Sequence, residues 1–171
     1  MDAISLLKDQ VKQAHGVVEG TVGDLTPEQL AWKPGGTANP MAGLLIHLIS
    51  GEDFFLKMMT GQQPLAMGPY AGKTGASEPH PMGNYGEWAA RVAVDLPPAL
   101  DYMRAVFRST EDYIDTLKPD DLDKEVDLSS AGLGKMTMGG FLSMIAVIHP
   151  SNHIGEISCM KGQQGGKGYP F

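Results

Sequence analysis

Residues 39–60 decide the fold of this chain, and they read NPMAGLLIHLISGEDFFLKMMT. Asn39 and Pro40 form a helix cap followed by a first-turn proline, a common start of an α-helix. Apolar side chains then recur every three or four residues, which is the period of an amphipathic helix. We therefore expect one long helix that ends at about Thr60 and carries His47 on its apolar, inward stripe.

The same apolar period predicts three further long helices. They are expected at residues 2–22, from Asn84 to Lys118 with a bend or break at Pro97–Pro98, and at 138–161. A short helix should follow Thr26-Pro27, and residues 119–136 should be mostly connection. No stretch alternates polar and apolar residues as a strand would. The pattern favours an all-α chain, an antiparallel four-helix bundle, in a single domain over residues 1–171.

A long Gly/Pro-rich loop is predicted between the second and third long helices, at residues 61–84. Between Gly61 and Gly86, six glycines and four prolines fall within 26 positions. Structureless loops longer than ~12–15 residues are uncommon in compact domains and are usually functional or disordered. The segment is therefore either a mobile surface excursion or a lid over a pocket, and the sequence leaves both interpretations open.

The composition restricts the classes of partner. The chain has 171 residues, 42% of them apolar, and its 13 Lys and Arg against 20 Asp and Glu give a net charge of −7. Nucleic-acid binding depends on neutralising phosphates, so this charge without a basic cluster argues against it. No apolar run is long enough to span a membrane. A single cysteine excludes an internal disulfide or a CxxC site, and no signal peptide starts the chain, so we expect a cytoplasmic location.

Three histidines carry the chemical signal. His149 and His153 are four residues apart in one predicted helix, so their side chains are neighbours on its surface. Alone, this spacing is typical of ordinary packing or surface histidines. His47, however, lies among apolar residues, where an imidazole is costly unless something binds it. A cation shared with the facing pair would supply that partner, so His47, His149 and His153 are predicted to form a divalent metal site.

Residues near this site have several possible roles. Glu156 is three residues beyond His153 and could be a fourth ligand, an acceptor for the other nitrogen of an imidazole, or a general base; it could equally be an interhelical carboxylate. Pro150 should kink the helix by freeing the carbonyl of Ala146. His80 is expected to be a solvated loop histidine, although it could move toward the site. Cys159 is expected to be a small buried residue.

Four segments together resemble the DinB-like (damage-inducible) superfamily. They are Trp32-Lys-Pro34, Asn39-Pro-Met-Ala-Gly-Leu-Leu-Ile-His47-Leu, His149-Pro-Ser-Asn-His153-Ile-Gly-Glu-Ile, and the tail Lys161–Phe171. The resemblance covers nearly the whole chain in order and length. It implies an up-up-down-down four-helix bundle, often a homodimer, whose divalent metal is held by His47, His149 and His153. Pro150 is a departure from a generic HxxxH pattern.

The resemblance also implies an activity. Some relatives are thiol-dependent, such as bacillithiol or mycothiol S-transferases and a maleylpyruvate isomerase. The leading hypothesis is an enzyme that uses zinc, nickel, manganese or iron to activate a low-molecular-weight thiol toward a small-molecule substrate. Metal-assisted hydrolysis is the second hypothesis. A non-catalytic bundle with a structural metal, whose loop binds a protein or small ligand, is the third.

Overall fold

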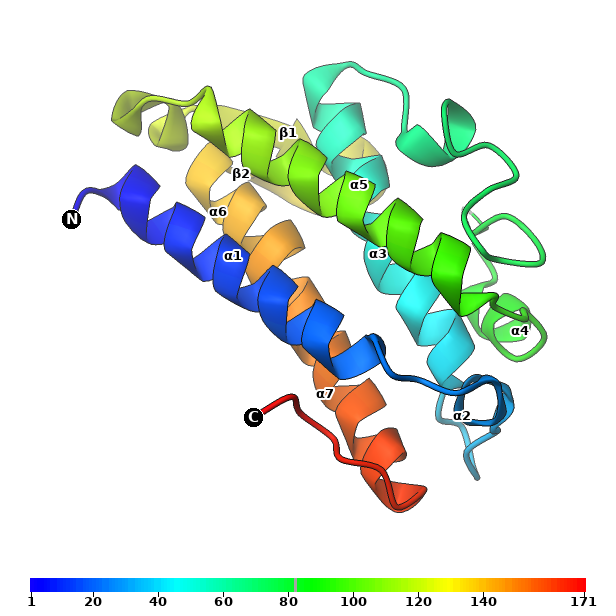
Figure 1. Ribbon diagram of the computed structural model, residues 1–171. Coiled ribbons are helices and arrows are strands. Elements are labelled where there is room, and N and C mark those ends of the chain that lie inside the picture. Colours follow the sequence, from blue (N-terminus) through cyan, green and yellow to red (C-terminus); the bar gives the residue numbers. More distant parts are fainter. Residues whose placement is uncertain (82) are drawn as a thin grey trace.

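Apolar runs with a helical period become long helices in the computed structural model, which describes residues 1–81 and 83–171 (Figure 1). The helices and strands are α1 (Ala3–Val22), α2 (Pro27–Ala31), α3 (Met41–Thr60), α4 (Tyr85–Ala89), α5 (Leu96–Asp115), β1 (Glu125–Leu128), β2 (Gly134–Thr137), α6 (Met138–Ser143) and α7 (His149–Gln163). A π-helical turn (Met144–Ile148) joins α6 to α7, and short 3₁₀ turns lie at Leu65–Met67, Pro119–Asp123 and Ser129–Ala131. The fold is mostly helical, as predicted. In the described part of the chain, no helix is both long and apolar enough to cross a membrane.

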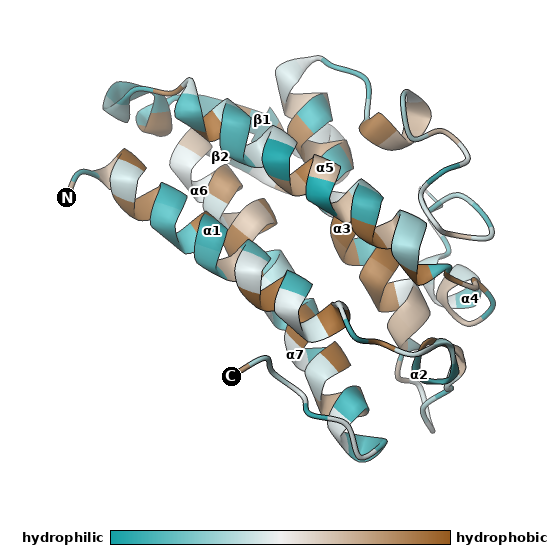
Figure 2. Cartoon of the chain, viewed as in Figure 1, coloured by the Kyte–Doolittle hydropathy of each residue, from teal (hydrophilic) through white to brown (hydrophobic). Residues whose placement is uncertain are grey.

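Four long helical segments pack around a shared core. α1 and α3 each contact both α5 and the α6–α7 segment. The outward faces of α1 and α5 are largely hydrophilic in Figure 2. The buried apolar side chains form one cluster that includes the end of α1 and the start of α3, and a second that includes the start of α1 and the end of α3. α1 and α3 are therefore antiparallel.

The predicted up-up-down-down order is wrong for this chain. Leu100 and Met103 near the start of α5 join the same cluster as the start of α3, so α3 and α5 run in the same direction. α1 and α7 both run the opposite way (Figure 1). The reason lies in the connections: α2 stays at the end where α1 stops, because Leu25 and Leu30 join that cluster. A helix of ~30 Å can be spanned by roughly ten extended residues. The 61–95 segment is far longer than this, so it can return the chain to the other end of the bundle.

The predicted third helix is broken, as expected, but the break lies before the prolines rather than at them. It divides into α4 and α5, and Pro97 and Pro98 lie in the first turn of α5 rather than at a bend. A first-turn proline costs no hydrogen bond, because the first backbone N–H groups of a helix have no intrahelical acceptor. The loop before α5 is also paired, since Ala76 forms an isolated antiparallel bridge with Val94.

A short hairpin replaces part of the predicted connection at 119–136. β1 and β2 pair antiparallel, with Val126 and Leu128 buried and Glu125 and Asp127 exposed. This alternation spans only four residues, too few to separate a strand from a loop by sequence pattern. The hairpin covers one end of the bundle, where Val126 and Leu128 join its apolar cluster.

The last long helical segment begins at its predicted residue, Met138, and contains the predicted irregularity. The Thr137 hydroxyl accepts a hydrogen bond from the Gly140 N–H, 3.1 Å away. Pro150 has no N–H to donate to the carbonyl of Ala146, and the wider π-helical turn lies directly before it. The backbone N–H of His149 donates to the carbonyl of Met144, five residues back. This turn sets the direction in which α7 presents its two histidines.

Candidate metal centre

Three imidazoles from two antiparallel helices meet inside the bundle. His47 comes from α3, and His149 and His153 come from α7, which packs against α3. One ring nitrogen from each residue can be chosen so that all three lie within 4.8 Å of one another. The ring centroid of His47 lies 5.1 Å from that of His149 and 4.9 Å from that of His153. The structure thus brings together the three residues that the sequence analysis grouped.

The nitrogen spacing suits a shared cation. The Nε2 atoms of His47 and His149 are 3.3 Å apart. Two nitrogens bound tetrahedrally to one zinc ion lie about 3.3–3.4 Å apart when each bond is about 2.0–2.1 Å long. This pair of rings therefore has the separation that a bridging ion requires.

Two of the rings have their other nitrogen held by a partner. His153 Nδ1 lies 2.9 Å from the Oε2 atom of Glu156, and His47 Nδ1 lies 3.0 Å from the Nε2 atom of His80. When Nδ1–H donates to these acceptors, each Nε2 keeps a free lone pair. Metal-binding histidines almost always have such a partner, which fixes the ring and its tautomer. Of the roles considered for Glu156, this contact matches that of acceptor for a ligating imidazole.

The environment keeps two of these imidazoles neutral. Burial, with the neighbouring rings of His149, His153 and His80, lowers the pKa of His47 to about 3. The pKa of His149 is lowered to about 4, mainly by burial and further by the neighbouring rings of His153 and His80. Metal ligation requires the neutral imidazole, so two of the nitrogen donors are in the required protonation state at neutral pH.

A glycine on α3 allows the close approach of His149. A Cβ atom placed on Gly51 would lie 3.0 Å from the Cε1 atom of His149. Gly51 is one helical turn beyond His47, so the missing side chain opens the α3 surface beside the first imidazole. The spacing of four residues from His47 puts Gly51 on the same helix face, but nothing in the sequence indicates this role.

Aromatic side chains close the site on the side of α4. The ring of Tyr85 lies 4.4 Å from that of His47, centroid to centroid, and the ring of Trp88 lies 4.9 Å from that of His80. The hydroxyl of Tyr85 is buried and has no hydrogen-bond partner among the described residues. Burial raises the pKa of Tyr85, and the charge of Glu156 raises it further. Tyr85 thus holds a protonated hydroxyl, a potential hydrogen-bond donor, close to the imidazoles.

Sequence reasoning missed some of these residues. His80 is half-buried against His47, not solvated in a loop. The flanking Pro79 and Pro81, which restrict the backbone, were the only sequence signal for a fixed position. Nothing in the sequence distinguished Tyr85. Cys159 is exposed, contrary to the prediction that it is buried.

The family can now be identified. A family model described as the DinB superfamily matches residues 10–157. The chain belongs to the DinB superfamily. This DinB chain is also similar to a solved structure described as the crystal structure of the conserved protein of locus from Enterococcus faecalis, with a TM-score of 0.75 and 20% identity over 95% of this chain and 99% of that one. At this identity the likeness shows the fold alone. No curated protein matches the chain.

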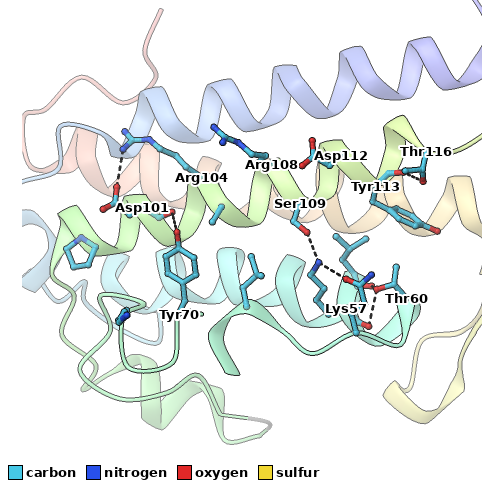
Figure 3. Close-up of a pocket in the computed structure, with 16 residues that line it drawn as sticks. Lys57, Thr60, Tyr70, Asp101, Arg104, Arg108, Ser109, Asp112, Tyr113 and Thr116 are labelled. Atoms are coloured by element: carbon cyan, nitrogen blue, oxygen red, sulfur yellow. Dashed lines mark hydrogen bonds and ion pairs between the residues drawn. The ribbon is translucent and has the colours of Figure 1, made fainter. Parts of the chain in front are cut away.

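Two hollows flank α3 in this DinB chain, and one of them reaches the imidazoles. A cavity of about 450 Å³ lies between α3 and the 64–81 segment, and both His47 and His80 line it. A groove of about 950 Å³ lies between α3 and α5 and is lined by residues such as Lys57, Arg104 and Arg108 (Figure 3). Among the described residues, none of the clustered histidines lines the groove. The smaller cavity is therefore the one that adjoins the candidate metal centre.

Proposed function

We propose that this DinB-superfamily chain is a metal-dependent enzyme in which His47, His149 and His153 hold a divalent ion. The observation that carries the proposal is the convergence of three ring nitrogens within 4.8 Å beside a cavity of about 450 Å³. The imidazole donor set suits zinc, nickel or iron, and manganese is a further candidate.

The number of protein ligands supports a catalytic rather than a structural role. Structural zinc sites are closed by four protein ligands, whereas catalytic sites keep a position open. Within the described residues, no fourth His, Cys, Asp or Glu belongs to the cluster. Glu156 contacts the remote nitrogen of His153 rather than joining the three ring nitrogens. This arrangement speaks against the non-catalytic bundle with a structural metal.

The chain's own residues prepare the site for reaction. A divalent ion held here would supply a Lewis acid that lowers the pKa of a thiol or a water molecule. Glu156 and His80 hold the Nδ1 atoms of His153 and His47, so the Nε2 atom of each ring is left free to bind an ion. The buried hydroxyl of Tyr85 would donate a hydrogen bond to a substrate oxygen or leaving group.

We propose thiol S-transfer as the reaction, with a low-molecular-weight thiol attacking an electrophile. The support for a thiol comes from the family. The chain belongs to the DinB superfamily, and the resemblance to this superfamily implies thiol-dependent relatives. Metal-assisted hydrolysis remains the second candidate, because the same open position would serve water as well as a thiol.

The test begins with metal content. Protein purified without chelator should carry close to one equivalent of zinc, nickel, manganese or iron per chain, and His153→Ala and His47→Ala should each reduce it sharply. His15→Ala is the matched control, because that imidazole lies in another part of the bundle, between Glu52 and Glu111. Full occupancy that survives both ligand substitutions would refute the site.

Activity is then measured on a panel. Monochlorobimane, epoxides and maleylpyruvate are combined with bacillithiol, mycothiol, glutathione and coenzyme A, beside esterase and amidase substrates. Metal-dependent thiol consumption that His153→Ala abolishes would support the transferase, and metal-dependent hydrolysis without thiol would favour the hydrolase. Inactivity of the metal-loaded protein on the whole panel, with a fourth protein ligand found at the ion, would favour the non-catalytic bundle.

We also propose that the chain forms a homodimer. Ile148 and Phe171 are apolar and exposed, at 53% and 82% of their surface, and would gain from burial between two copies. Sedimentation at micromolar concentration should show a species of twice the chain mass. A single species of the monomer mass would contradict the dimer.

A further inference from the structure

The cavity beside His47 has a definite roof and floor. α3 supplies the floor, which includes Gly51, Phe54 and Phe55, and the 64–81 segment supplies the roof. The roof is anchored by Asp53, whose carboxylate accepts hydrogen bonds from the backbone N–H groups of Leu65 (2.9 Å) and Ala66 (3.0 Å). A cavity of about 450 Å³ is within the usual range for small-molecule sites, roughly 300–1,000 Å³.

The walls are mainly apolar and carry no positive charge. Two phenylalanines, a methionine and three prolines line the cavity, with hydroxyls from Ser50, Thr74 and Ser77. Among the described lining residues there is no lysine or arginine. An anionic group placed among these walls would lose its hydration without gaining a counter-charge from the lining residues, so only an ion held by the three histidines could balance it.

Both carboxylates of the cavity are already engaged. Asp53 accepts from the two roof N–H groups and from the Tyr102 hydroxyl, 2.9 Å away. Glu78 forms a bidentate ion pair with Arg91, with a closest contact of 2.8 Å. Hydrogen bonds occupy the Asp53 carboxylate and an ion pair occupies that of Glu78, so both are already bound to groups of the protein.

The groove between α3 and α5 has the opposite character. Lys57 donates to the Ser109 hydroxyl at 2.6 Å, and Arg104 pairs with Asp101 (Figure 3). Arg108 has no ion-pair partner among the described residues. Positive charge on this part of the surface is thus separated from the metal centre, and an anion attracted to it would not be placed beside His47.

We infer that the cavity takes an uncharged, largely apolar part of the substrate, and that its walls discriminate against carboxylates, phosphates and sulfonates that do not reach the ion. The inference rests on the proposed function in one respect, because it treats the ligand of the cavity as a substrate. The binding preference itself rests only on the cavity and its walls. It favours a neutral electrophile, such as an apolar epoxide, over a dicarboxylate such as maleylpyruvate.

The experiment uses two fluorescent probes that share one ring system. N-phenyl-1-naphthylamine is uncharged, and 8-anilino-1-naphthalenesulfonate adds a sulfonate to the same scaffold. We expect the metal-free protein to bind the uncharged probe at least about tenfold more tightly. Equal affinities, or tighter binding of the sulfonate, would overturn the inference.

Matched variants locate the binding site. Ala66→Trp fills the cavity from its roof and should raise the Kd of the uncharged probe at least about tenfold. Ala71→Trp, in the same segment but exposed and outside the lining, should leave the Kd unchanged. An Ala66→Trp variant that melts like the parent chain and binds the probe equally well would place the probe elsewhere and refute the inference.

A gain of function tests the role of charge. Thr74→Lys puts a cation at the cavity wall and should strengthen binding of the sulfonated probe about tenfold, whereas Arg108→Gln in the groove should not alter binding at the cavity. No gain with Thr74→Lys would show that the absence of positive charge is not what excludes anions, which overturns the argument.

Failure of this inference and failure of the proposed function can be told apart. Probe selectivity that persists in metal-free protein and in His153→Ala supports the cavity preference even if no metal is bound. Metal-dependent turnover of an anionic electrophile, with no preference for the uncharged probe, would instead support the proposed enzyme and refute the cavity's preference for uncharged ligands. Binding of the uncharged probe should also alter the visible spectrum of cobalt-loaded protein, and an unchanged spectrum would refute the contact between cavity and metal.

Discussion

Replacing Gly51 by alanine should separate metal affinity from fold stability. Gly51 lies inside α3, and a Cβ atom there would sit 3.0 Å from the Cε1 atom of His149. Gly16 lies inside α1, and a Cβ atom there would meet nothing within 4 Å. Gly16→Ala is therefore the matched control for the same chemical change.

The two effects have different sizes and directions. Replacing glycine by alanine inside a helix stabilises it by about 0.5–1 kcal/mol, so Gly16→Ala should raise the free energy of unfolding by about that amount. In Gly51→Ala the same gain is offset by the contact with His149, whose ring must retreat by a few tenths of an ångström. Metal–ligand distances are held within about 0.2 Å, so we expect Gly51→Ala to lower metal affinity by about tenfold.

Two measurements test this pair. Urea unfolding of the metal-free proteins gives the stability of each variant, and titration of zinc or cobalt against a chelating dye gives the affinity. If Gly51→Ala binds the ion as tightly as Gly16→Ala, the His149 ring does not bind the ion from the position that the ring has in this structure. The reasoning would also fail if both variants lost affinity equally.

Three further substitutions test residues next to the imidazoles, and a pH series tests the imidazoles themselves. Glu156→Gln should slow turnover while metal content by elemental analysis stays nearly intact, because the amide oxygen still accepts from His153; loss of the ion would refute this. His80→Ala should weaken metal binding about tenfold in the dye titration, since His47 loses its Nδ1 partner, and unchanged affinity would show that the contact does not matter. Tyr85→Phe should reduce turnover yet leave the free energy of unfolding in urea unchanged or raised by up to about 1 kcal/mol, because the removed hydroxyl is buried without a partner among the described residues; a clear destabilisation would indicate a structural role. The pKa values of His47 and His149 are lowered to about 3 and about 4, so the unfolded chain takes up protons at a higher pH than the folded chain. The free energy of unfolding of the metal-free protein in urea should therefore fall progressively from pH 6.5 toward pH 4. A flat pH profile would contradict this expectation.

The helical part of the fold was readable from the sequence because it depends on local patterns. The periodic apolar runs give α1 and α3 within about one residue of their predicted starts, although Pro40 rather than Asn39 is the N-cap residue of α3 and no side chain caps it. The direction of α5 was not readable, since it depends on where residues 61–95 travel. Pro97 and Pro98 fit the start of a helix as well as a break, and the apolar residues of α4 continued the period across the gap.

The candidate site divides in the same way. His149 and His153 share a helix, so their spacing alone places them together, and His47 joined them because an inward imidazole needs a partner. His80 and Tyr85 reach His47 only through the path of the loop and of α4, which no period in the sequence encodes. Local chemistry therefore predicted the three clustered imidazoles, and tertiary folding supplied the groups that orient and enclose them.

A single stretch of α3, residues 47–53, links the candidate metal centre to the roof of the cavity. His47 holds the end of the roof segment through His80, and Asp53 holds its beginning through the N–H groups of Leu65 and Ala66. Gly51, between them, admits His149. Because a helix fixes the spacing of its own side chains, the roof cannot shift far at either anchor without disturbing a hydrogen bond made from α3. A displacement at His80 would reach the ring of His47 through the contact between their ring nitrogens, so filling the cavity and positioning an imidazole are mechanically connected, and the apolar ligand inferred above would act on the candidate metal centre through His80.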